Sequence, residues 1–368
     1  MGTAVGDFAT LSLEGSGLER QPRVPPDKRA KGYADRFDAT TLWLDAVWTG
    51  QEVVLVCPRL NNLWFTVTCA AFALDGRPVR ARLRRYYRHT LISLKAPVRP
   101  DRVSVRIGDW VGETGVHGPQ TAGFAGLNVL MTLSKDNDPA WIEDWARFHV
   151  RHHGAQACLF VDNGSAEHGP EAIRPALERA GLSRSVILSA PLRYGPRGKP
   201  PFVNAELFLQ TGVMNVLRLR FLKQARAVLN CDIDELVMTP GRTVFDLAAG
   251  SARGFVQFPG RWVHPAPGSE GWSWHARHTY ADSPARPCPP KWCIVPDGPL
   301  GRFQWRPHEL EGLPLQRRFR AESAWFYHCR TITNGWKSQS RTGVNDNTVP
   351  DEVLVAALDA ADLPRRTG

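Results

Sequence analysis

Several features are missing from this 368-residue sequence, and each absence excludes a class of protein. No apolar run reaches the roughly 18 residues that a membrane-spanning helix needs. The first residues lack the charged, apolar and small-residue succession of a secretory signal, and Gly6 stands where a myristoylation signal requires Ser or Thr. No basic run with interleaved aromatic residues of the RNA-binding type occurs. We therefore expect a cytoplasmic protein that binds no nucleic acid.

Cysteine is sparse and scattered. The seven cysteines are odd in number, and no CxxC motif occurs. The one close pair is Cys288 and Cys293 in CPPKWC, and no His/Cys cluster with zinc-site spacing flanks it. This pattern favours reduced thiols over disulfides.

What is present is the composition of a globular protein, with 43% hydrophobic and 22% charged residues. The net charge of +10 favours an anionic partner such as a nucleotide, a phospholipid surface or an acidic polymer, although an arginine-rich composition accounts for it equally well. Such a charge would allow peripheral association with the inner face of a membrane, but no amphipathic anchor is visible. The sequence does not indicate an oligomeric state.

Composition divides the chain into four stretches. Residues 1–35 are rich in Gly, Pro and charge and predict a flexible leader. Residues 36–122 alternate short β-rich runs with turn signals, among them the Asp-Gly of LDGRP, and predict a small antiparallel sandwich or barrel. Residues 123–350 form the largest stretch, and residues 351–368 a C-terminal tail.

The largest stretch has the alternation of an α/β fold. GLNVLMTL is a continuous apolar run that predicts a strand buried on both faces. A helix follows, with Asp138 as its N-cap, Pro139 in its first turn and Gly154 at its end. AQACLFV and SVILSA predict two more strands around the helix GPEAIRPALERAGL, and a helical region from about Asn204 to Gln224 leads into AVLNC. This order predicts a parallel sheet with right-handed crossovers.

In AVLNCDIDELVMTP an apolar run, which predicts a strand, is followed directly by three carboxylates, those of Asp232, Asp234 and Glu235. Residues i and i+2 of a strand project to the same side, about 6.6 Å apart at Cα. Asp232 and Asp234 therefore point together, out of the sheet end, and one divalent cation can bridge or lean on both. Oxygen ligands suit Mg²⁺ or Mn²⁺. A bare DxD is more often a surface acidic turn, but the apolar run and the parallel-sheet context favour a metal site.

FVDNGS supplies a second polar strand end. Asp162 can accept hydrogen bonds from a nucleobase or ribose, and Asn163-Gly164 predicts a tight turn that lets backbone amides approach a ligand. The alternative is a strand-to-helix turn without a ligand. Because ligands gather at the carboxyl ends of parallel strands, we expect this turn and the acidic run to face one crevice.

These motifs together resemble the A-fold glycosyltransferases, in the family 2-like group that includes the family 92 branch. The resemblance covers about residues 126–343. It is carried by LMTLSKDNDPAWIEDWARFHVRHHG, FVDNGS, LNCDIDELVMTP, QFPGRWVHPA, KWCIVPDG and YHCRTITNGWKSQSRTG. The Lys-Asn-Glu of that family is replaced here by Asp136-Asn137-Asp138. The resemblance implies a Rossmann-like nucleotide-diphospho-sugar transferase domain of A type, preceded by a small β-rich, sandwich-like domain.

The resemblance also implies roles for individual residues. Asp232 and Asp234 would hold Mn²⁺ or Mg²⁺, with His328 as a third ligand, and imidazole beside carboxylate suits Mn²⁺. The alternative for His328 is a partly buried structural histidine. The residues expected to contact the nucleotide-sugar donor are Thr132, Ser134, Lys135, Asn137, Asp138, Asp162, Asn163, Lys337 and Arg341. The last two would meet the diphosphate as charge-assisted donors, unless they are solvated surface charges.

The implied activity is transfer of a sugar from a nucleotide-sugar donor, by default UDP-linked, to a glycan, polysaccharide or lipid-linked acceptor, with inversion. An inverting enzyme needs a base for the acceptor hydroxyl. Glu309 has a narrow preference because it lies in an irregular Pro-flanked segment, and His308, Glu270 and His264 are the other candidates.

Tryptophan is abundant in the same stretch. Five of the 13 tryptophans crowd into it: Trp262, Trp272, Trp274, Trp292 and Trp305. Indole rings stack on the apolar faces of sugars, which suits a carbohydrate acceptor, but tryptophan is also an ordinary core residue.

Two other functions stay open. A nucleotidyltransferase of sugar activation would need a Gly-rich, Lys-containing loop after the first strand, and SKDNDP has no glycine. A non-catalytic carbohydrate-binding protein would use the β-rich domain, and loss of Asp234 would leave its binding intact.

Overall fold

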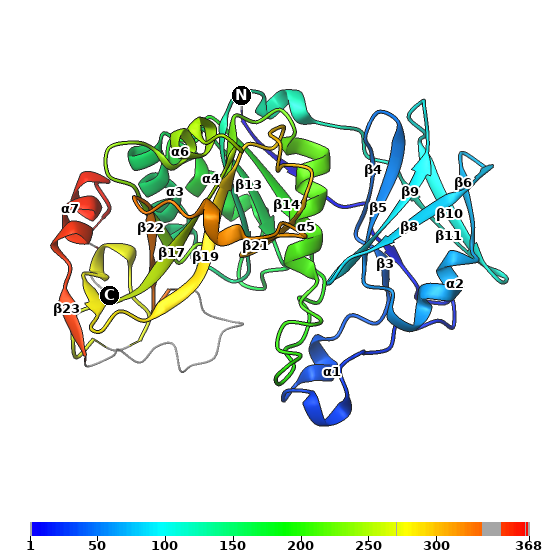
Figure 1. Cartoon of the computed structure of the whole chain (residues 1–368), viewed down its shortest axis with the longest axis horizontal. Coiled ribbons are helices and arrows are strands. Elements are labelled where there is room, and N and C mark those ends of the chain that lie inside the picture. The colour runs from blue at the N-terminus through cyan, green and yellow to red at the C-terminus, as the bar shows by residue number, and fades with distance from the viewer. Residues whose placement is uncertain (1, 270, 333–346, 365, 367–368) are drawn as a thin grey trace.

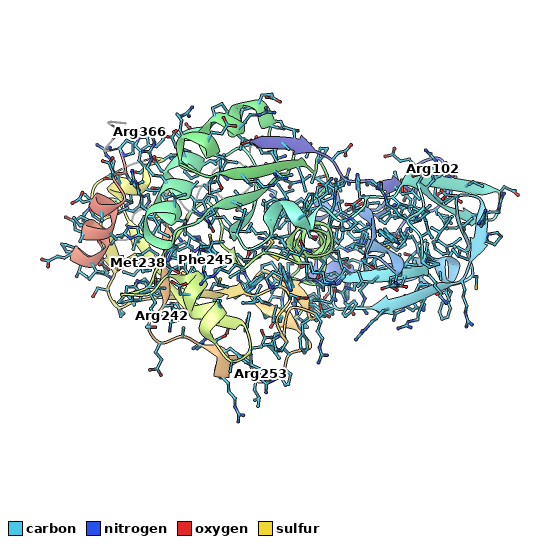
Figure 2. All side chains as sticks on the ribbon, turned by 90° about the horizontal axis from the view of Figure 1, so that it is seen from above. Arg102, Met238, Arg242, Phe245, Arg253 and Arg366 are labelled. Carbon is cyan, nitrogen blue, oxygen red and sulfur yellow. The ribbon has the colours of Figure 1, made fainter. Side chains whose placement is uncertain are left out.

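The structure is a computed structural model, which describes residues 2–269, 271–332, 347–364 and 366. It has two parts side by side, an α/β part around a large sheet and a β-rich part (Figure 1). Seen from above, Arg102 lies in the β-rich part and Arg366 at the opposite end of the molecule (Figure 2). No helix among the described residues has the length and apolarity needed to cross a bilayer.

The β-rich part consists of two four-stranded antiparallel sheets and a short two-stranded one. The first sheet has the order β4 (Asp45–Trp48), β5 (Glu52–Pro58), β9 (His89–Lys95), β8 (Ala81–Arg85), and the second β11 (Trp110–Gly115), β10 (Arg102–Ile107), β6 (Ala71–Leu74), β7 (Arg77–Val79). β2 (Leu11–Ser12) pairs with β3 (Thr41–Trp43). Alternate residues of both larger sheets point into one core, for example Val53 and Leu55 from β5 and Val103 and Val105 from β10. This alternation is the sandwich pattern that the sequence predicts.

One expected strand is partly helical. LWFTVTCAAFAL, one of the β-rich runs of residues 36–122, starts at the last residue of a 3-10 turn (Asn61–Leu63). It continues as α2 (Trp64–Thr68), and only its end forms β6. The helix buries Val67 and leaves Phe65 79% exposed, so one-sided packing overrides the β preference of these residues. The following turn is as expected: Asp75 and Gly76 have φ of 47° and 76°, the left-handed values that a tight hairpin turn requires.

The α/β part is mixed. In the described part of the chain its sheet has 11 strands, and the central order is β1-β14-β13-β12-β15-β19-β17-β18-β23. The parallel half comprises β1 (Thr3–Gly6), β14 (Arg184–Ser189), β13 (Ala157–Asp162), β12 (Asn128–Ser134) and β15 (Ala227–Asn230). The other half comprises β19 (Pro287–Ile294), β17 (Phe255–His264), β18 (Tyr280–Asp282), β23 (Thr348–Pro350), β16 (Glu235–Met238) and β22 (Trp325–Cys329). Most pairs in this half are antiparallel, and β17 with β22 is parallel.

Helices cover both faces of this sheet. The alternation along β12 sends Leu130 to one face and Val129 and Met131 to the other. The Leu130 face packs against α3 (Pro139–His153), α4 (Pro170–Arg179), α6 (Val244–Gly250) and α7 (Glu352–Ala360). The opposite face packs against α5 (Leu209–Leu217) and the π-helical turn that follows it (Arg218–Leu222), which carry the contacts to the β-rich part. The remaining short elements are α1 (Tyr33–Arg36), β20 (Gln304–Arg306), β21 (Glu309–Glu311), and 3-10 turns at Pro26–Lys28, Thr121–Phe124, His275–Arg277 and Gln316–Phe319.

The two chain ends differ from expectation. Residues 1–35 are expected to form a flexible leader, but Thr3–Gly6 is β1, which pairs in parallel with β14. Leu13 and Val24 are buried, and the buried Arg20 bonds to Asp38, so this segment packs against the body. The described residues 351–364 are likewise not a separate tail, because α7 buries Leu354 in the core of the large sheet. The N-terminal segment has few apolar residues, and tertiary contacts rather than local pattern order it.

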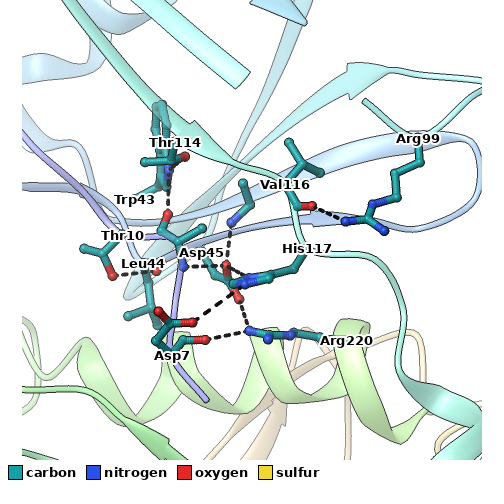
Figure 3. Close-up of polar contacts among 12 residues, drawn as sticks. Asp7, Thr10, Trp43, Leu44, Asp45, Arg99, Thr114, Val116, His117 and Arg220 are labelled. Atoms are coloured by element: carbon teal, nitrogen blue, oxygen red, sulfur yellow. Dashed lines mark hydrogen bonds and ion pairs between the residues drawn. The ribbon is translucent and has the colours of Figure 1, made fainter. Parts of the chain in front are cut away.

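A buried ionic joint connects the two parts (Figure 3). Asp45 of β4 is fully buried and accepts from His117 Nδ1 at 2.8 Å and from Arg220 Nη1 at 3.3 Å. Arg220, from the π-helical turn, also donates to the carbonyl of Asp7 at 2.8 Å. The joint therefore ties the N-terminal segment, the β-rich part and the α/β part at one point.

Candidate functional site

Three parallel strands end at one edge of the large sheet, and polar residues follow each of them. Ser134, the last residue of β12, is in register with Asp162 at the end of β13. On the other side of β12, Met131 is in register with Asn230, the last residue of β15. Lys135, Asn163 and the acidic run after β15 therefore lie along the same edge.

The acidic run is a turn, not a continuing strand. β15 ends at Asn230 and β16 begins at Glu235, so Asp232 and Asp234 lie in the connection between them. The expected i, i+2 alignment of these two aspartates is therefore wrong, because the strand geometry that would produce it stops earlier. The two carboxylates have different partners.

Asp234 belongs to a cluster of three metal-ligating side chains, together with Glu235 and His328. One ligand atom from each lies within 4.8 Å of the others, and all three residues are buried. Glu235 and His328 face each other across the β16–β22 pair, which brings residues far apart in the chain together. His328 Nε2 lies 3.1 Å from Asp234 Oδ2, and the ring stacks on Trp262 at 3.9 Å between centroids. The imidazole is therefore held on two sides.

Asp232 belongs instead to an ion pair with Lys291 of β19. Lys291 Nζ is 2.9 Å from Asp232 Oδ2 and 3.0 Å from Glu235 Oε2, and this lysine is 1% exposed. The backbone N–H of Asp232 also donates to Glu235 Oε2 at 2.8 Å. Lys291 thus joins the acidic turn to the antiparallel half of the sheet.

Charge in this cluster is unbalanced, with three carboxylates around one ammonium group. Burial lowers the pKa of Lys291, but the charges of Asp232 and Glu235 outweigh burial and hold that pKa above its ordinary value. Burial raises the pKa of Glu235, Lys291 opposes the rise, and Asp232 and Asp234 add to it. The lysine therefore stays charged, and the excess of negative charge disfavours ionisation of Glu235. A second cation would relieve this excess.

The donor set fits a divalent metal ion. Two carboxylates and an imidazole suit Mn²⁺, and carboxylates also suit Mg²⁺. Opposite ligands of one ion at roughly 2.2 Å lie about 4.4 Å apart, close to the span of the three ligand atoms. The residues that could hold the ion are Asp234, Glu235 and His328, with Asp232 beside them.

A pocket of about 180 Å³ opens onto this cluster. The cluster residues Glu235 and His328 line it, together with Asp232, Trp262 and His308. Two arginines add positive charge to the wall, Arg88 and Arg197. We call this pocket the acidic pocket.

His308 is neutral in the acidic pocket. Burial lowers its pKa, Lys291 adds to that effect, and the pKa falls to about 4. Its Nδ1 lies 3.0 Å from the carbonyl of Pro290, which can only accept, so Nδ1 carries the hydrogen. Nε2 is left with a lone pair.

Glu309 lies elsewhere, although the sequence favours it as the base. Its carboxylate pairs with Arg306, and its side chain lines a different pocket from the acidic one. The third candidate, Glu270, lies outside the described residues, as do Lys337 and Arg341. His264 is fully buried and bonded to Asp282 at 2.7 Å. Of the base candidates in the described residues, His308 is the one that lines the acidic pocket.

A second pocket, of about 450 Å³, lies beside the acidic pocket. Lys135 and Asn163 line it from the ends of β12 and β13, and Tyr194 lines both pockets. Asp35 and Arg36, from the N-terminal segment, form part of its wall. We call it the strand-end pocket.

The other expected donor contacts mostly stabilise the protein itself. Asp162 accepts from Ser165 Oγ at 2.5 Å, which closes its own turn. Asp138 accepts from Ala140 N at 2.7 Å and caps α3. Ser134 accepts from Asn137 Nδ2 at 2.7 Å, and both residues are buried, as is Thr132. Asn163 donates to the carbonyls of Ala190 and Leu192, and Lys135 Nζ to those of Asn163 and Gly164.

The five tryptophans of the expected acceptor stretch lie in different environments. Trp262 lines the acidic pocket, whereas Trp292 and Trp305 are fully buried and pack edge to face. Trp272 is 39% exposed and, like Trp274, contacts Trp141. Only Trp262 is placed to stack on a ligand in the acidic pocket.

Two residues of the site are absent from the predicted set, Glu235 and Lys291. Glu235 is the fourth residue of Asp-Ile-Asp-Glu. A prediction that treated this run as a turn rather than a strand would have included Glu235 in the site. Lys291 begins KWCIVPDG, but its distance from the acidic run in the sequence conceals the pairing. The register of Asn230 with Trp292 brings them together.

Comparisons with known proteins do not assign the chain to a family. No model of a protein family matches the chain, and no curated protein matches it.

Proposed function

We propose that this chain is a metal-dependent glycosyltransferase. It transfers a sugar from a nucleotide-sugar donor, UDP-linked by default, to a glycan, polysaccharide or lipid-linked acceptor with inversion. The observation that carries the proposal is the buried cluster of Asp234, Glu235 and His328 beside a pocket at the carboxyl edge of a parallel sheet. A buried excess of carboxylates calls for a cation, and a bound cation in turn attracts a diphosphate.

The strand order supports an A-type nucleotide-sugar domain. β14, β13, β12 and β15 are adjacent in that order, so the chain moves outward in one direction from β12 and then in the other. Ligands of open α/β sheets bind outside the carboxyl ends of the strands where the order reverses, here between β12 and β15. The strand-end pocket and the acidic pocket both open there.

The two pockets divide the donor between them. The strand-end pocket takes the nucleoside, with Lys135 at its wall. The acidic pocket takes the diphosphate and sugar, where Mn²⁺ or Mg²⁺ held by Asp234, Glu235 and His328 would neutralise charge on the leaving diphosphate. Arg88 and Arg197 complement the same charge.

His308 serves as the base for the acceptor hydroxyl. It is neutral, and its Nε2 lone pair can accept a proton. Trp262 offers its ring to a sugar in the same pocket. Glu309, in contrast, is committed to Arg306.

Thermal-shift screening tests the proposal. UDP-, GDP- and CMP-linked sugars are compared with and without Mn²⁺, and we expect a large shift for one nucleotide that requires the metal. Release of nucleoside diphosphate from the donor would then separate transfer from a nucleotidyltransferase, which forms pyrophosphate. If no nucleotide-sugar shifts the melting temperature in the presence of either metal, the proposal is wrong.

A further inference from the structure

A separate cleft lies away from both the acidic pocket and the strand-end pocket. It has a volume of about 1090 Å³. Thr49, Pro119 and Thr121 line it from the β-rich side, and residues 218–225 and 296–302 supply other lining residues. Gln224 and Ala225 lie just before β15, so the cleft is at the amino edge of the parallel strands, opposite the candidate metal site.

Three basic side chains line this cleft, Arg218, Lys223 and Arg302, against one carboxylate, that of Asp297. We call it the basic cleft. Lys223 and Arg302 are exposed and Arg218 is half-buried. Net positive charge in a concave site attracts anions, because low-dielectric walls concentrate the field.

The backbone between Arg218 and Lys223 explains how they come together. Arg218–Leu222 is a π-helical turn with Lys223 as its C-cap. Residues five apart are one turn apart in a π-helix, so their side chains share a face, whereas an α-helix would separate them by about 140°. Such turns are rare and occur frequently at functional sites.

Arg218 has no carboxylate counter-ion in the parts of the chain that the structure describes. Its Nη1 contacts the carbonyl of Gly301 at 3.4 Å, and its Nε is out of solvent without a hydrogen-bond partner. Burial lowers the pKa of Arg218 to about 10. Arg220, on the same turn, shows the contrast: it is paired with Asp45. A guanidinium group that is partly desolvated and lacks an anion gains free energy by binding one.

We propose that the basic cleft binds a phosphate group, with Arg218 as the central donor and Lys223 and Arg302 as flanking cations. The planar guanidinium matches two oxygens of a phosphate, and the lysine contributes a point charge. The phosphate comes from a soluble phosphate compound or from an anionic lipid headgroup. This proposal does not depend on the glycosyltransferase activity.

Calorimetric titration of the full chain with inorganic phosphate and pyrophosphate tests the site. EDTA is present, and the Asp234→Asn variant is titrated in parallel, so that the metal cluster cannot account for binding. We expect Arg218→Gln/Lys223→Gln to weaken binding at least tenfold and Asp234→Asn to leave it unchanged. Retained affinity in the double variant, or no binding of either anion by the wild-type chain at millimolar concentration, overturns the proposal.

Matched variants control for charge and folding. Arg77→Gln/Arg80→Gln removes two exposed arginines of the β-rich part and is expected to bind phosphate like the wild type. Arg302→Gln changes an exposed loop residue, so it tests the cleft without disturbing the π-helical turn. Equal weakening by Arg77→Gln/Arg80→Gln would show a net-charge effect and overturn the proposal.

Vesicles identify the source of the phosphate. Flotation compares phosphatidylcholine vesicles with and without phosphatidic acid. Binding that needs phosphatidic acid and is lost in Arg218→Gln/Lys223→Gln assigns the cleft to a lipid headgroup. Phosphate binding without vesicle binding assigns it to a soluble compound.

Discussion

The imidazole of His153 donates to the carbonyl of Val237 across 2.8 Å. From one helical turn earlier on α3, His149 Nε2 accepts from the N–H of the same residue at 3.4 Å. Two histidines of α3 thus hold both backbone groups of Val237 in β16. Since β16 begins with Glu235, this clamp fixes the strand that carries a residue of the candidate metal site.

The two histidines that hold Val237 predict that the folded protein loses stability in acid. Burial lowers the pKa of His153 to about 4, and its Nδ1 accepts from Val244 N, so protonation would break a hydrogen bond. The pKa of His153 is lower in the folded state than in the unfolded state. Its neutral form therefore contributes stability that is fully present above about pH 6.5 and is lost as the pH falls through about 4. We expect up to ~3 kcal/mol of this loss from His153. Urea unfolding between pH 7 and pH 4 measures it, and His153→Gln, which keeps a donor and an acceptor, should show a shallower slope. An unchanged slope would contradict the assignment.

Asp234→Asn should abolish the metal-dependent stabilisation by a nucleotide-sugar and lower the transfer rate at least a hundredfold. The amide removes one charge from a cluster that must hold a divalent ion. Asp109→Asn, in the exposed β10–β11 turn, is the matched control and should behave like the wild type. Thermal shifts with and without Mn²⁺ provide the measurement. A variant that keeps its glycan binding but loses transfer would also argue against a carbohydrate-binding protein.

Lys291→Met should lower the free energy of unfolding by about 3–5 kcal/mol at neutral pH, because it leaves the buried Glu235 and the half-buried Asp232 without their cation. The pKa of Glu235 is already raised by burial and would rise further, so the loss should grow as pH increases and shrink in acid. Adding Glu235→Gln should restore part of the stability. Urea unfolding at pH 5 and pH 8 measures both effects, and an additive double variant would show that the two residues do not interact.

The neighbours His308 and Glu309 offer a paired test of the base. His308→Gln should reduce the transfer rate by 10²–10⁴-fold while leaving the donor-induced thermal shift intact. Glu309→Gln should retain most activity, because its carboxylate is paired with Arg306 outside the acidic pocket. Rates over a pH series with each variant make the comparison. The reverse pattern would restore Glu309 as the base.

Elements with local signals were predictable from the sequence. Asp138, Pro139 and Gly154 fix the ends of α3, and the structure has the cap, the first-turn proline and the left-handed glycine at those positions. The apolar runs of β12, β13 and β14 were equally visible, because strands buried on both faces need no alternation.

Elements that depend on distant partners were not predictable. β1 is only four residues long, and its pairing with β14 is the contact that places it in the sheet. Lys291 meets the acidic turn only through the register of β15 with β19. The assignment of Asp162 to a ligand overlooked Ser165, three residues away, which satisfies the carboxylate first. In each case the deciding contact is one that periodicity does not encode.

The Asp45–Arg220 joint bears on how substrates enter. Hinge opening between the two parts would separate the fully buried carboxylate of Asp45 from the guanidinium of Arg220, at a cost of several kcal/mol. The two parts should therefore move as one rigid body, and substrates must reach the pockets through movements of individual loops. Crosslinking the two parts across this joint should consequently leave turnover unaffected.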